Sequence, residues 1–200
     1  KFREKDFDVI ARARTETRLP KFLPINSFWG NIGQVITPVK VIEKGSNRTL
    51  QIETANFMHE RIVKKSVSTP QSYAIPAVSA DSFSRLLHRH AVPYLELDEA
   101  RNVTVEPCYL QSISEEYDDV YNRYSGLQIV TKKEPQTVEL GAGSLLVPLS
   151  GPTALRAALL LEPTQLYGLY QFDQFRELVD DDGRMPVFRV LRSADPSNHD

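Results

Sequence analysis

The stretch "SLLVPLSGPTALRAALLLEP", residues 144–163, decides the fold. Its first five residues read as a buried strand, because a short apolar run ends there at a proline. A Ser-Gly-Pro turn follows, and Pro152 suits the first turn of a helix that Pro163 ends. The expected apolar stripe of that helix consists of Leu155, Ala158 and Leu159. The stretch therefore predicts a strand, a turn and a helix, which serve either a site or a scaffold.

An earlier stretch has the same layout. "SYAIP", residues 72–76, shares with "SLLVP" a serine, an apolar triplet and a proline. A helix is expected next, with Ser79 or Asp81 as its N-cap, and "PYLEL", residues 93–97, reads as another strand. Strand, helix and strand predict a βαβ unit with parallel strands. The two stretches could also be one β-loop-α unit used twice, although five matched positions leave this open.

The rest of the chain alternates between apolar and polar residues, as β-strands do. Residues 34–57 predict two strands around a turn, and residues 102–117 and 124–140 predict antiparallel strands. The expected fold class is therefore α/β (α+β) and β-rich. It has a mixed sheet with a βαβ unit and two short helices, preceded by an antiparallel β segment. We expect a β-rich segment at 1–66, a mixed α/β module at 67–192 and a frayed tail at 193–200.

Composition excludes several classes of function. The chain has 200 residues, 41% of them hydrophobic and 25% charged, which describes one or two ordinary globular domains. A net charge of −2 provides no field to attract nucleic acid, and no apolar run approaches the roughly eighteen residues of a membrane span. Cys108 is the only cysteine, and its alternating surroundings predict a buried, inert thiol.

The histidines do not form a metal-binding motif. The chain has four, at positions 59, 88, 90 and 199. "HERIV" begins like a helical zinc motif, but Val63 stands where a second histidine is required. His88 and His90 are two residues apart, which places them on different sides of a helix. We therefore predict no catalytic, cofactor-binding or metal-binding residue in this chain.

Two groups of aromatic residues are candidates for a ligand-binding surface. They are Phe28 and Trp29, and, beside the acidic run "SEEYDD" at residues 114–119, Tyr117, Tyr121 and Tyr124. Phe28 and Trp29 could equally plug a loop from beneath, and the acidic run could be an ordinary solvated loop.

The segments around these motifs occur in the order of a known family. Residues 70–97, "PQSYAIPAVSADSFSRLLHRHAVPYLEL", are similar to a stretch in which Pro-x-Ala-Tyr-x-Ile-Pro precedes a helix and a short strand. "YSGLQ" at 124–128 resembles a Tyr-Glu-Gly stretch, and residues 140–163 resemble Pro-Ala-Gly-Ser and Leu-Leu-Glu-Pro elements. "YGLYQFDQF" at 167–175 is a weaker match. In these respects the chain resembles bacterial zinc carboxypeptidase homologues between Ser66 and Phe175.

The resemblance implies a scaffold. In that family the catalytic His-x-x-Glu pair, the distant histidine and the general-base glutamate belong to an upstream domain, and no residue here matches them. Three departures weaken any role in shaping a substrate groove. Ala91 replaces a glycine, Ser125 replaces a glutamate, and Ser150-Gly151-Pro152 replaces an Asn/Asp-Gln-Pro turn.

We therefore expect a non-catalytic C-terminal accessory domain, a piece of a longer peptide hydrolase. By resemblance, the parent is an exported zinc metallocarboxypeptidase, periplasmic or extracellular, with zinc in its catalytic domain. The expected partners are that domain and a peptide or cell-wall ligand. Two alternatives stay open, a free-standing ligand- or protein-binding module and a cryptic metal-dependent hydrolase built around His59 and Glu60.

Overall fold

The computed structural model describes residues 19–30, 36–55, 60–118 and 123–191 of the chain. The chain divides into two compact units. One unit is Pro24–Val67, and the other combines the residues up to Leu23 with those from Ser68 onward. The predicted boundary at residue 66 lies close to the second of these divisions.

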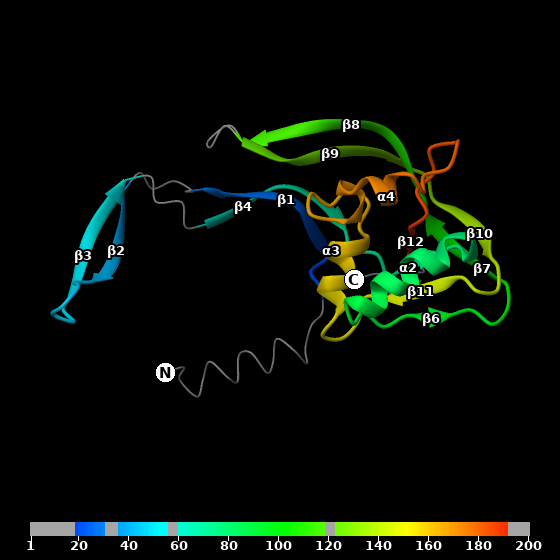
Figure 1. Cartoon of the computed structure of the whole chain (residues 1–200), viewed down its shortest axis with the longest axis horizontal. Coiled ribbons are helices and arrows are strands. Elements are labelled where there is room, and N and C mark those ends of the chain that lie inside the picture. Colours follow the sequence, from blue (N-terminus) through cyan, green and yellow to red (C-terminus); the bar gives the residue numbers. More distant parts are fainter. Residues whose placement is uncertain (1–18, 31–35, 56–59, 119–122, 192–200) are drawn as a thin grey trace, which may run out of the picture. The chain divides into compact units, whose positions relative to one another are not determined.

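The Pro24–Val67 unit is built from strands, two of which alternation in the sequence predicts. The strands β2 (Ile36–Ile42) and β3 (Thr49–Ala55) form an antiparallel hairpin whose register runs from Ile36 opposite Ala55 to Ile42 opposite Thr49. The other two strands, β1 (Phe22–Gly30) and β4 (Glu60–Ser68), pair with each other (Figure 1). The predicted antiparallel β segment is therefore present.

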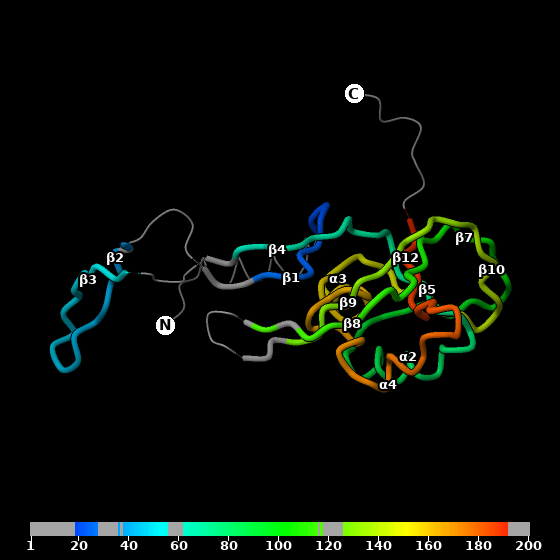
Figure 2. Tube along the Cα trace, turned by 90° about the horizontal axis from the view of Figure 1, so that it is seen from above, coloured from blue at the N-terminus to red at the C-terminus, as the bar shows by residue number. Residues whose placement is uncertain are grey.

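The larger unit is organised around a six-stranded sheet with the order β10-β7-β12-β5-β11-β6. Figure 2 shows β5 and β12 of this sheet next to each other, with β7 and β10 beyond them. Each pair of neighbouring strands in the sheet is antiparallel. The strands are β5 (Ser72–Ile75), β6 (Leu95–Glu96), β7 (Arg101–Glu106), β10 (Gln136–Leu140), β11 (Leu145–Pro148) and β12 (Phe188–Val190). The β-rich α+β class is therefore confirmed.

The predicted βαβ unit differs from the structure in one respect. β5, helix α2 (Ala77–Arg89) and β6 follow one another as expected. β5 and β6 run in the same direction because both pair antiparallel with β11, but β11 lies between them. β5 and β6 are therefore not adjacent strands. The sheet was expected to mix parallel and antiparallel pairs, but its neighbouring strands pair antiparallel. The order of strands in a sheet depends on which strands pair with each other. Alternation of residues along one strand does not reveal its partner.

The two similar stretches lie side by side. In the β5–β11 pair, Ala74 lies opposite Leu146, and Tyr73 lies opposite Val147. The middle residue of "SYAIP" therefore faces the middle residue of "SLLVP", as in a local twofold arrangement. Each strand also leads into a helix, β5 into α2 and β11 into α3 (Ala154–Leu161). This arrangement agrees with the idea of one β-loop-α unit used twice.

The helix boundaries and faces correct two expectations. Helix α2 begins at Ala77 with Pro76 as N-cap, so neither Ser79 nor Asp81 caps it. The N–H of Ala77 instead donates to the hydroxyl of Ser144, the residue just before β11. In α3 the buried residues are Ala154, Ala157, Ala158 and Leu161. Leu155 and Leu159 are exposed, so Ala158 is the one residue of the predicted stripe that is buried.

Long strands between these elements form an antiparallel hairpin, β8 (Cys108–Asp118) with β9 (Arg123–Lys133). The predicted segment at 102–117 is divided at Pro107, which separates β7 from β8 because proline cannot donate to the ladder. The acidic run was expected in a loop, but Glu115 and Asp118 belong to β8. Two short helices, η1 (Leu169–Gln171) and α4 (Asp173–Arg176), precede β12.

The two faces of the large sheet carry different side chains, because successive residues of a strand point to opposite faces. One face contributes a core cluster of Ala74, Leu97, Val105, Leu140, Phe188 and Val190. The opposite face carries the alternate residues of the same strands, including Tyr73, Glu106 and Arg189. This second set forms the candidate site.

Candidate functional site

A buried arginine lies at the centre of this face. Arg189 is the middle residue of β12, and its residue is 1% exposed. Its Cα partners are Tyr73 on β5 and Glu106 on β7, so three polar side chains stand side by side on adjacent strands. A buried guanidinium is costly unless it is paired and hydrogen-bonded. The contacts that compensate the buried charge of Arg189 therefore define the residues of this site.

Arg189 uses each of its nitrogens. Nε donates to Oε2 of Glu162 at 3.2 Å, and Nη1 donates to Oε2 of Glu106. Nη2 donates to the carbonyl oxygen of Ser68 and, at 3.3 Å, to its hydroxyl oxygen. The guanidinium thus joins three parts of the chain that are far apart in sequence. It ties β12 to β7, to the residue that ends α3 and to the last residue of β4.

Glu162 is the second buried charge. It is the C-cap of α3 and is 1% exposed. Its Oε2 also accepts a hydrogen bond of 2.9 Å from the Tyr73 hydroxyl. Its Oε1 lies 3.8 Å from Lys133 Nζ and has no hydrogen-bond partner within the described part of the chain. Lys133, Glu162, Arg189 and Glu106 therefore form a line of alternating charges, which we call the charge line.

Burial and the charge line together shift the pKa values of nearby groups. Burial and the Glu162 carboxylate raise the pKa of Tyr73 well above its ordinary value. Burial alone would lower the pKa of Arg189, but Glu162 and Glu106 outweigh it and the pKa is raised. Burial raises the pKa of the Cys108 thiol to about 12, against a smaller lowering by Lys133. Tyr170 also has a raised pKa, mainly from burial.

The contacts of these groups hold several segments of the chain together, so the charge line acts as a structural clamp. Cys108 is buried, as predicted, and its raised pKa keeps the thiol protonated at neutral pH. Tyr73 and Arg189 are held in their protonated forms as hydrogen-bond donors. Two positive and two negative side chains lie next to one another in the charge line. Their attraction offsets the desolvation cost of burying Arg189 and Glu162.

Two further contacts join motif residues. The hydroxyl of Ser144, which is 0% exposed, accepts a hydrogen bond of 3.2 Å from the N–H of Ala77 and so caps α2 from a distant segment. The side-chain amide of Gln171 bridges the backbone of Leu127, accepting from its N–H at 2.6 Å and donating to its carbonyl at 2.8 Å. Beside it, a Cβ on Gly126 would lie 3.0 Å from Leu166 Cδ1.

The predicted aromatic surface falls into two groups on different units. Phe28 and Trp29 belong to β1. Tyr117 and Tyr124 are Cα partners in the β8–β9 hairpin. Tyr117 is 53% exposed, and its hydroxyl donates to Glu115 Oε2 at 2.7 Å. Tyr121 lies outside the described residues. The pairing of Tyr117 with Tyr124 is the one new proximity among these candidates.

Two of the four histidines lie in the described part of the chain, both at the end of α2. His88 lies in the last turn of α2, and His90 is its C-cap, whose carbonyl accepts a hydrogen bond of 2.7 Å from Arg156. His59 and His199 lie outside the described residues, and Glu60 begins β4. Within the ranges that the structure describes, no three His, Cys, Asp or Glu residues could hold one metal ion. Nor does any helix in those ranges have the length and apolar character to cross a membrane.

Comparison with known proteins adds no relative. No protein-family model, no curated protein and no solved structure matches the chain.

Sequence reasoning missed the charge line itself. Arginine and glutamate are almost never fully buried unless they are paired, so a charged residue inside an apolar run is a useful signal. "PVFRVL" places Arg189 in such a run, and "LLLEP" places Glu162 at the end of another. The signal marks a buried charge, but it does not say which distant charge is its partner.

Proposed function

We propose that this chain is the non-catalytic accessory module of a zinc metallocarboxypeptidase-like peptide hydrolase, and that it packs on the catalytic domain upstream in the same polypeptide. The zinc of that enzyme is held by the catalytic domain, and the protein is exported to the periplasm or the cell exterior. The module helps to frame access to the substrate cleft.

One observation carries this proposal. The motifs on which the family resemblance rests contact one another inside the large unit. Tyr73 of "SYAIP" bonds Glu162 of "LLLEP" at 2.9 Å, and Ser144 of "SLLVP" caps the helix that follows "SYAIP". Gln171 of "YGLYQFDQF" holds Leu127 of "YSGLQ". Residues with these roles stabilise a scaffold, which favours an accessory module over a site of reaction.

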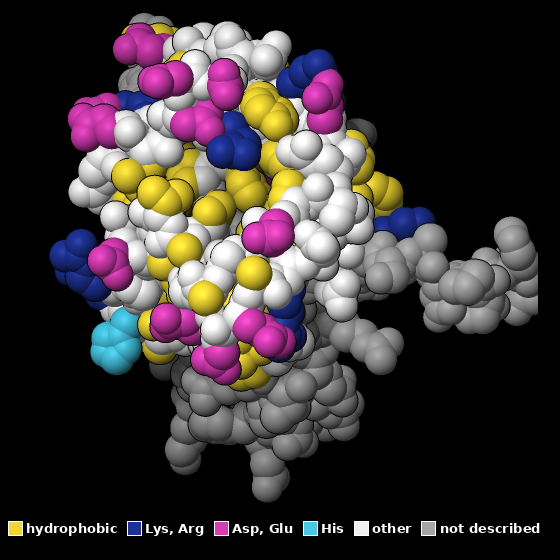
Figure 3. Space-filling model, turned by 90° about the vertical axis from the view of Figure 1, so that its right-hand side faces the viewer, with side chains coloured by type: hydrophobic (Ala, Val, Ile, Leu, Met, Phe, Trp, Pro, Cys, Tyr) yellow, Lys and Arg dark blue, Asp and Glu magenta, His cyan; other side chains and the backbone are white. Residues whose placement is uncertain are grey.

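The less covered face of the large sheet suits docking to another domain. Val103, Val138 and Leu146 pack against the core cluster there but are only partly buried. Figure 3 views the side on which β7 and β10 lie, and hydrophobic side chains gather in its middle with acidic side chains above and below. We infer that the upstream domain presents an apolar patch with basic residues around it to this face.

The test compares three proteins. The 200-residue chain alone, the gene product that includes the region upstream, and the upstream region alone are assayed for zinc and for release of the C-terminal residue from a peptide. The proposal expects zinc and turnover only where the upstream region is present, and complex formation when the two parts are mixed. Turnover by the 200-residue chain alone, or an upstream region unrelated to a peptidase, would overturn it.

Docking has its own matched variants. Val103→Lys with Val138→Lys places two charges among the partly buried apolar side chains of this face and should weaken association with the upstream region. Ile52→Lys with Val63→Lys adds the same charge at two exposed apolar residues of the Pro24–Val67 unit and should leave association unchanged. Equal effects of both pairs in folded protein would show that added charge alone matters, which contradicts this docking face.

A second candidate function is a free-standing binding module. The exposed ring of Tyr117 and its Cα partner Tyr124 favour it, because exposed aromatic rings commonly contact ligands. In that case the chain alone would bind peptides or cell-wall fragments, and Tyr117→Ala would weaken the binding. Binding by the chain alone that does not need the upstream region would support this function over the accessory role.

A further inference from the structure

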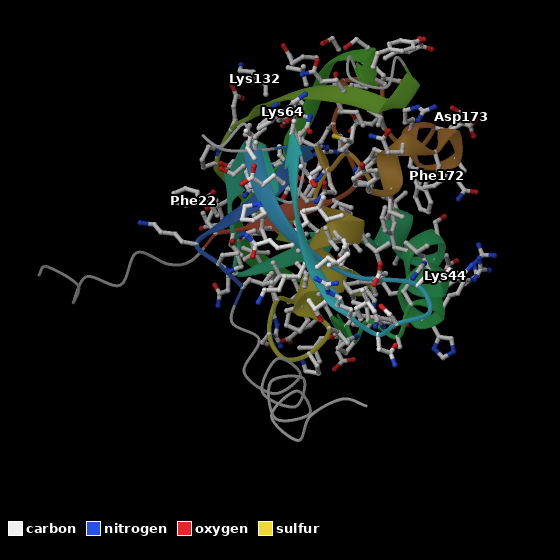
Figure 4. The ribbon with its side chains drawn as sticks, turned by 90° about the vertical axis from the view of Figure 1, so that its left-hand side faces the viewer. Phe22, Lys44, Lys64, Lys132, Phe172 and Asp173 are labelled. Atoms are coloured by element: carbon white, nitrogen blue, oxygen red, sulfur yellow. The ribbon has the colours of Figure 1, made fainter. Side chains whose placement is uncertain are left out.

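A pocket opens between helices α2 and α4 of the large unit, away from the charge line. Its volume is about 280 Å³, near the small end of the range for ligand pockets. Figure 4 shows Phe172 and Asp173 at the start of α4, which lies above α2 in that view. The lining residues are Ser82, Arg85, Leu86, Arg89, Gln174, Phe175 and Leu178.

The polar wall of the pocket carries two positive charges. Arg85 and Arg89 are four residues apart on α2, so they lie one turn apart on the same side of the helix. Nε of Arg85 donates to the backbone carbonyl of Asp81 at 3.3 Å, which is not an ion pair. Arg89 forms no ion pair with a residue in the described part of the chain. No acidic side chain lines the pocket, and Asp173 on α4 is paired with Arg176.

Three of the other five lining residues are apolar, and Ser82 and Gln174 are polar. Phe175 is 6% exposed, and its ring packs against Phe83 of α2 with centroids 5.6 Å apart. Leu86 and Leu178 are half-buried beside it, and each comes from a different side of the pocket. This contact between helices holds the Phe175 ring, which with Leu86 and Leu178 forms the apolar floor of the pocket.

We propose that this pocket binds a small monocarboxylate with an apolar body, such as an N-acylated apolar amino acid. Guanidinium groups bind carboxylates through paired hydrogen bonds, and the apolar body of the ligand covers the floor. The pocket lies beside the last two turns of α2, where the negative end of the helix dipole disfavours a doubly charged phosphate more than a single carboxylate. This inference goes beyond the accessory role and does not depend on it.

The experiment titrates the 200-residue chain with N-acetylphenylalanine and, as the uncharged analogue, N-acetylphenylalanine amide. Binding is followed by calorimetry and by NMR shifts of the α2 and α4 amides. The carboxylate should bind saturably, and the amide should bind at least about tenfold more weakly, since a charge-assisted hydrogen bond contributes about 1.5–3 kcal/mol. Arg85→Gln and Arg89→Gln should each cause a similar loss.

A neighbouring arginine provides the control. Arg156 is exposed and donates to the carbonyl of His90, but it does not line the pocket, so Arg156→Gln should leave affinity unchanged. All three arginines are exposed, and circular dichroism should show each variant folded. Equal affinity for the amide, no loss in either pocket variant, or equally tight binding of inorganic phosphate would each overturn the proposal. The assay uses no upstream region, so its failure leaves the accessory role untouched.

Discussion

Arg189 and Glu162 are the residues on which the large unit depends most strongly. Each is about 1% exposed, and each has the other as a partner in the charge line. Removing one member of a buried pair leaves the other charge without compensation, which costs more than the pair itself contributes. The energetic role of these residues is therefore measured best by comparison with a matched exposed pair.

Arg189→Met should lower the free energy of unfolding by about 3–5 kcal/mol, because Glu162 stays buried without its guanidinium partner. Arg101→Met is the control, since Arg101 on β7 forms an exposed pair with Glu99 at 3.6 Å, and less than about 1 kcal/mol should be lost. Urea unfolding followed by circular dichroism measures both variants. Similar losses would show that the charge line is not a clamp.

Cys108 makes stability depend on pH. The pKa of its thiol is about 12 in the folded chain and about 8.5 for an ordinary thiol, so the folded state favours the protonated form. The contribution is complete below pH 8.5 and is lost as pH rises toward 12. Relative to Cys108→Ala, the native chain should lose about 2 kcal/mol between pH 8 and pH 10.5.

The comparison with Cys108→Ala cancels the titration of the tyrosines and lysines, which both proteins share. Urea midpoints at the two pH values give the difference directly. In its folded state the thiol should also resist a disulfide-exchange reagent at pH 8 and react once urea is added. A constant difference between the two proteins across this range would contradict the raised pKa.

At the scale of elements, β5 and β11 are coupled to the helices that follow them. Ser144, just before β11, caps the beginning of α2, which follows β5. The cap comes from a residue 67 positions away, so α2 starts at Ala77 although no suitable side chain precedes it. The helix thus depends on the pairing of β5 with β11.

Ser144→Ala should lower the free energy of unfolding by about 1 kcal/mol, the usual effect of losing a cap, because the Ala77 N–H is left without its acceptor. Ser84→Ala provides the same substitution inside α2, and should be neutral or slightly stabilising because alanine favours helices. Thermal unfolding of both variants tests this. A larger loss from Ser84→Ala would show that α2 is not capped from β11.

The strands and helices also show which features the residue pattern predicts and which it does not. Alternation located β2, β3, β7, β8, β9 and β10, but it predicted neither β1 nor β4. It also did not detect the break at Pro107 or the shortness of β6, which has two residues. The apolar spacing in residues 154–161 predicts a stripe of Leu155, Ala158 and Leu159, whereas Ala154, Ala157, Ala158 and Leu161 are buried. Seven of these eight residues are apolar, so apolar spacing alone does not select which face is buried.

For the whole molecule, the two units should differ in local stability. Among described residues of the Pro24–Val67 unit, Ile25 alone is buried, whereas the large unit has an extensive core. A two-stranded hairpin is marginally stable by itself, and amides exchange according to the free energy of local opening. Amides of β2 and β3 should therefore exchange hydrogen much faster than those of β5 and β11.

Hydrogen exchange followed by mass spectrometry or NMR measures this difference. The amides of β5 and β11 should be exposed only by global unfolding, and the Arg189→Met variant should accelerate their exchange without changing that of β2 and β3. Equal protection in both units of the native chain would show that the hairpin is stabilised as strongly as the core.

The sequence by itself determined the β-rich α+β class, the main strands and both longer helices, because those follow from local spacing of apolar residues and from prolines. Only the tertiary structure decided that β11 separates β5 from β6 and that Arg189 meets Glu106 and Glu162. It also brought Arg85 and Arg89 beside the floor formed by Phe175. Tyr73 and Glu162 are 89 residues apart, and no local period encodes contacts over such separations, since they depend on how whole elements pack.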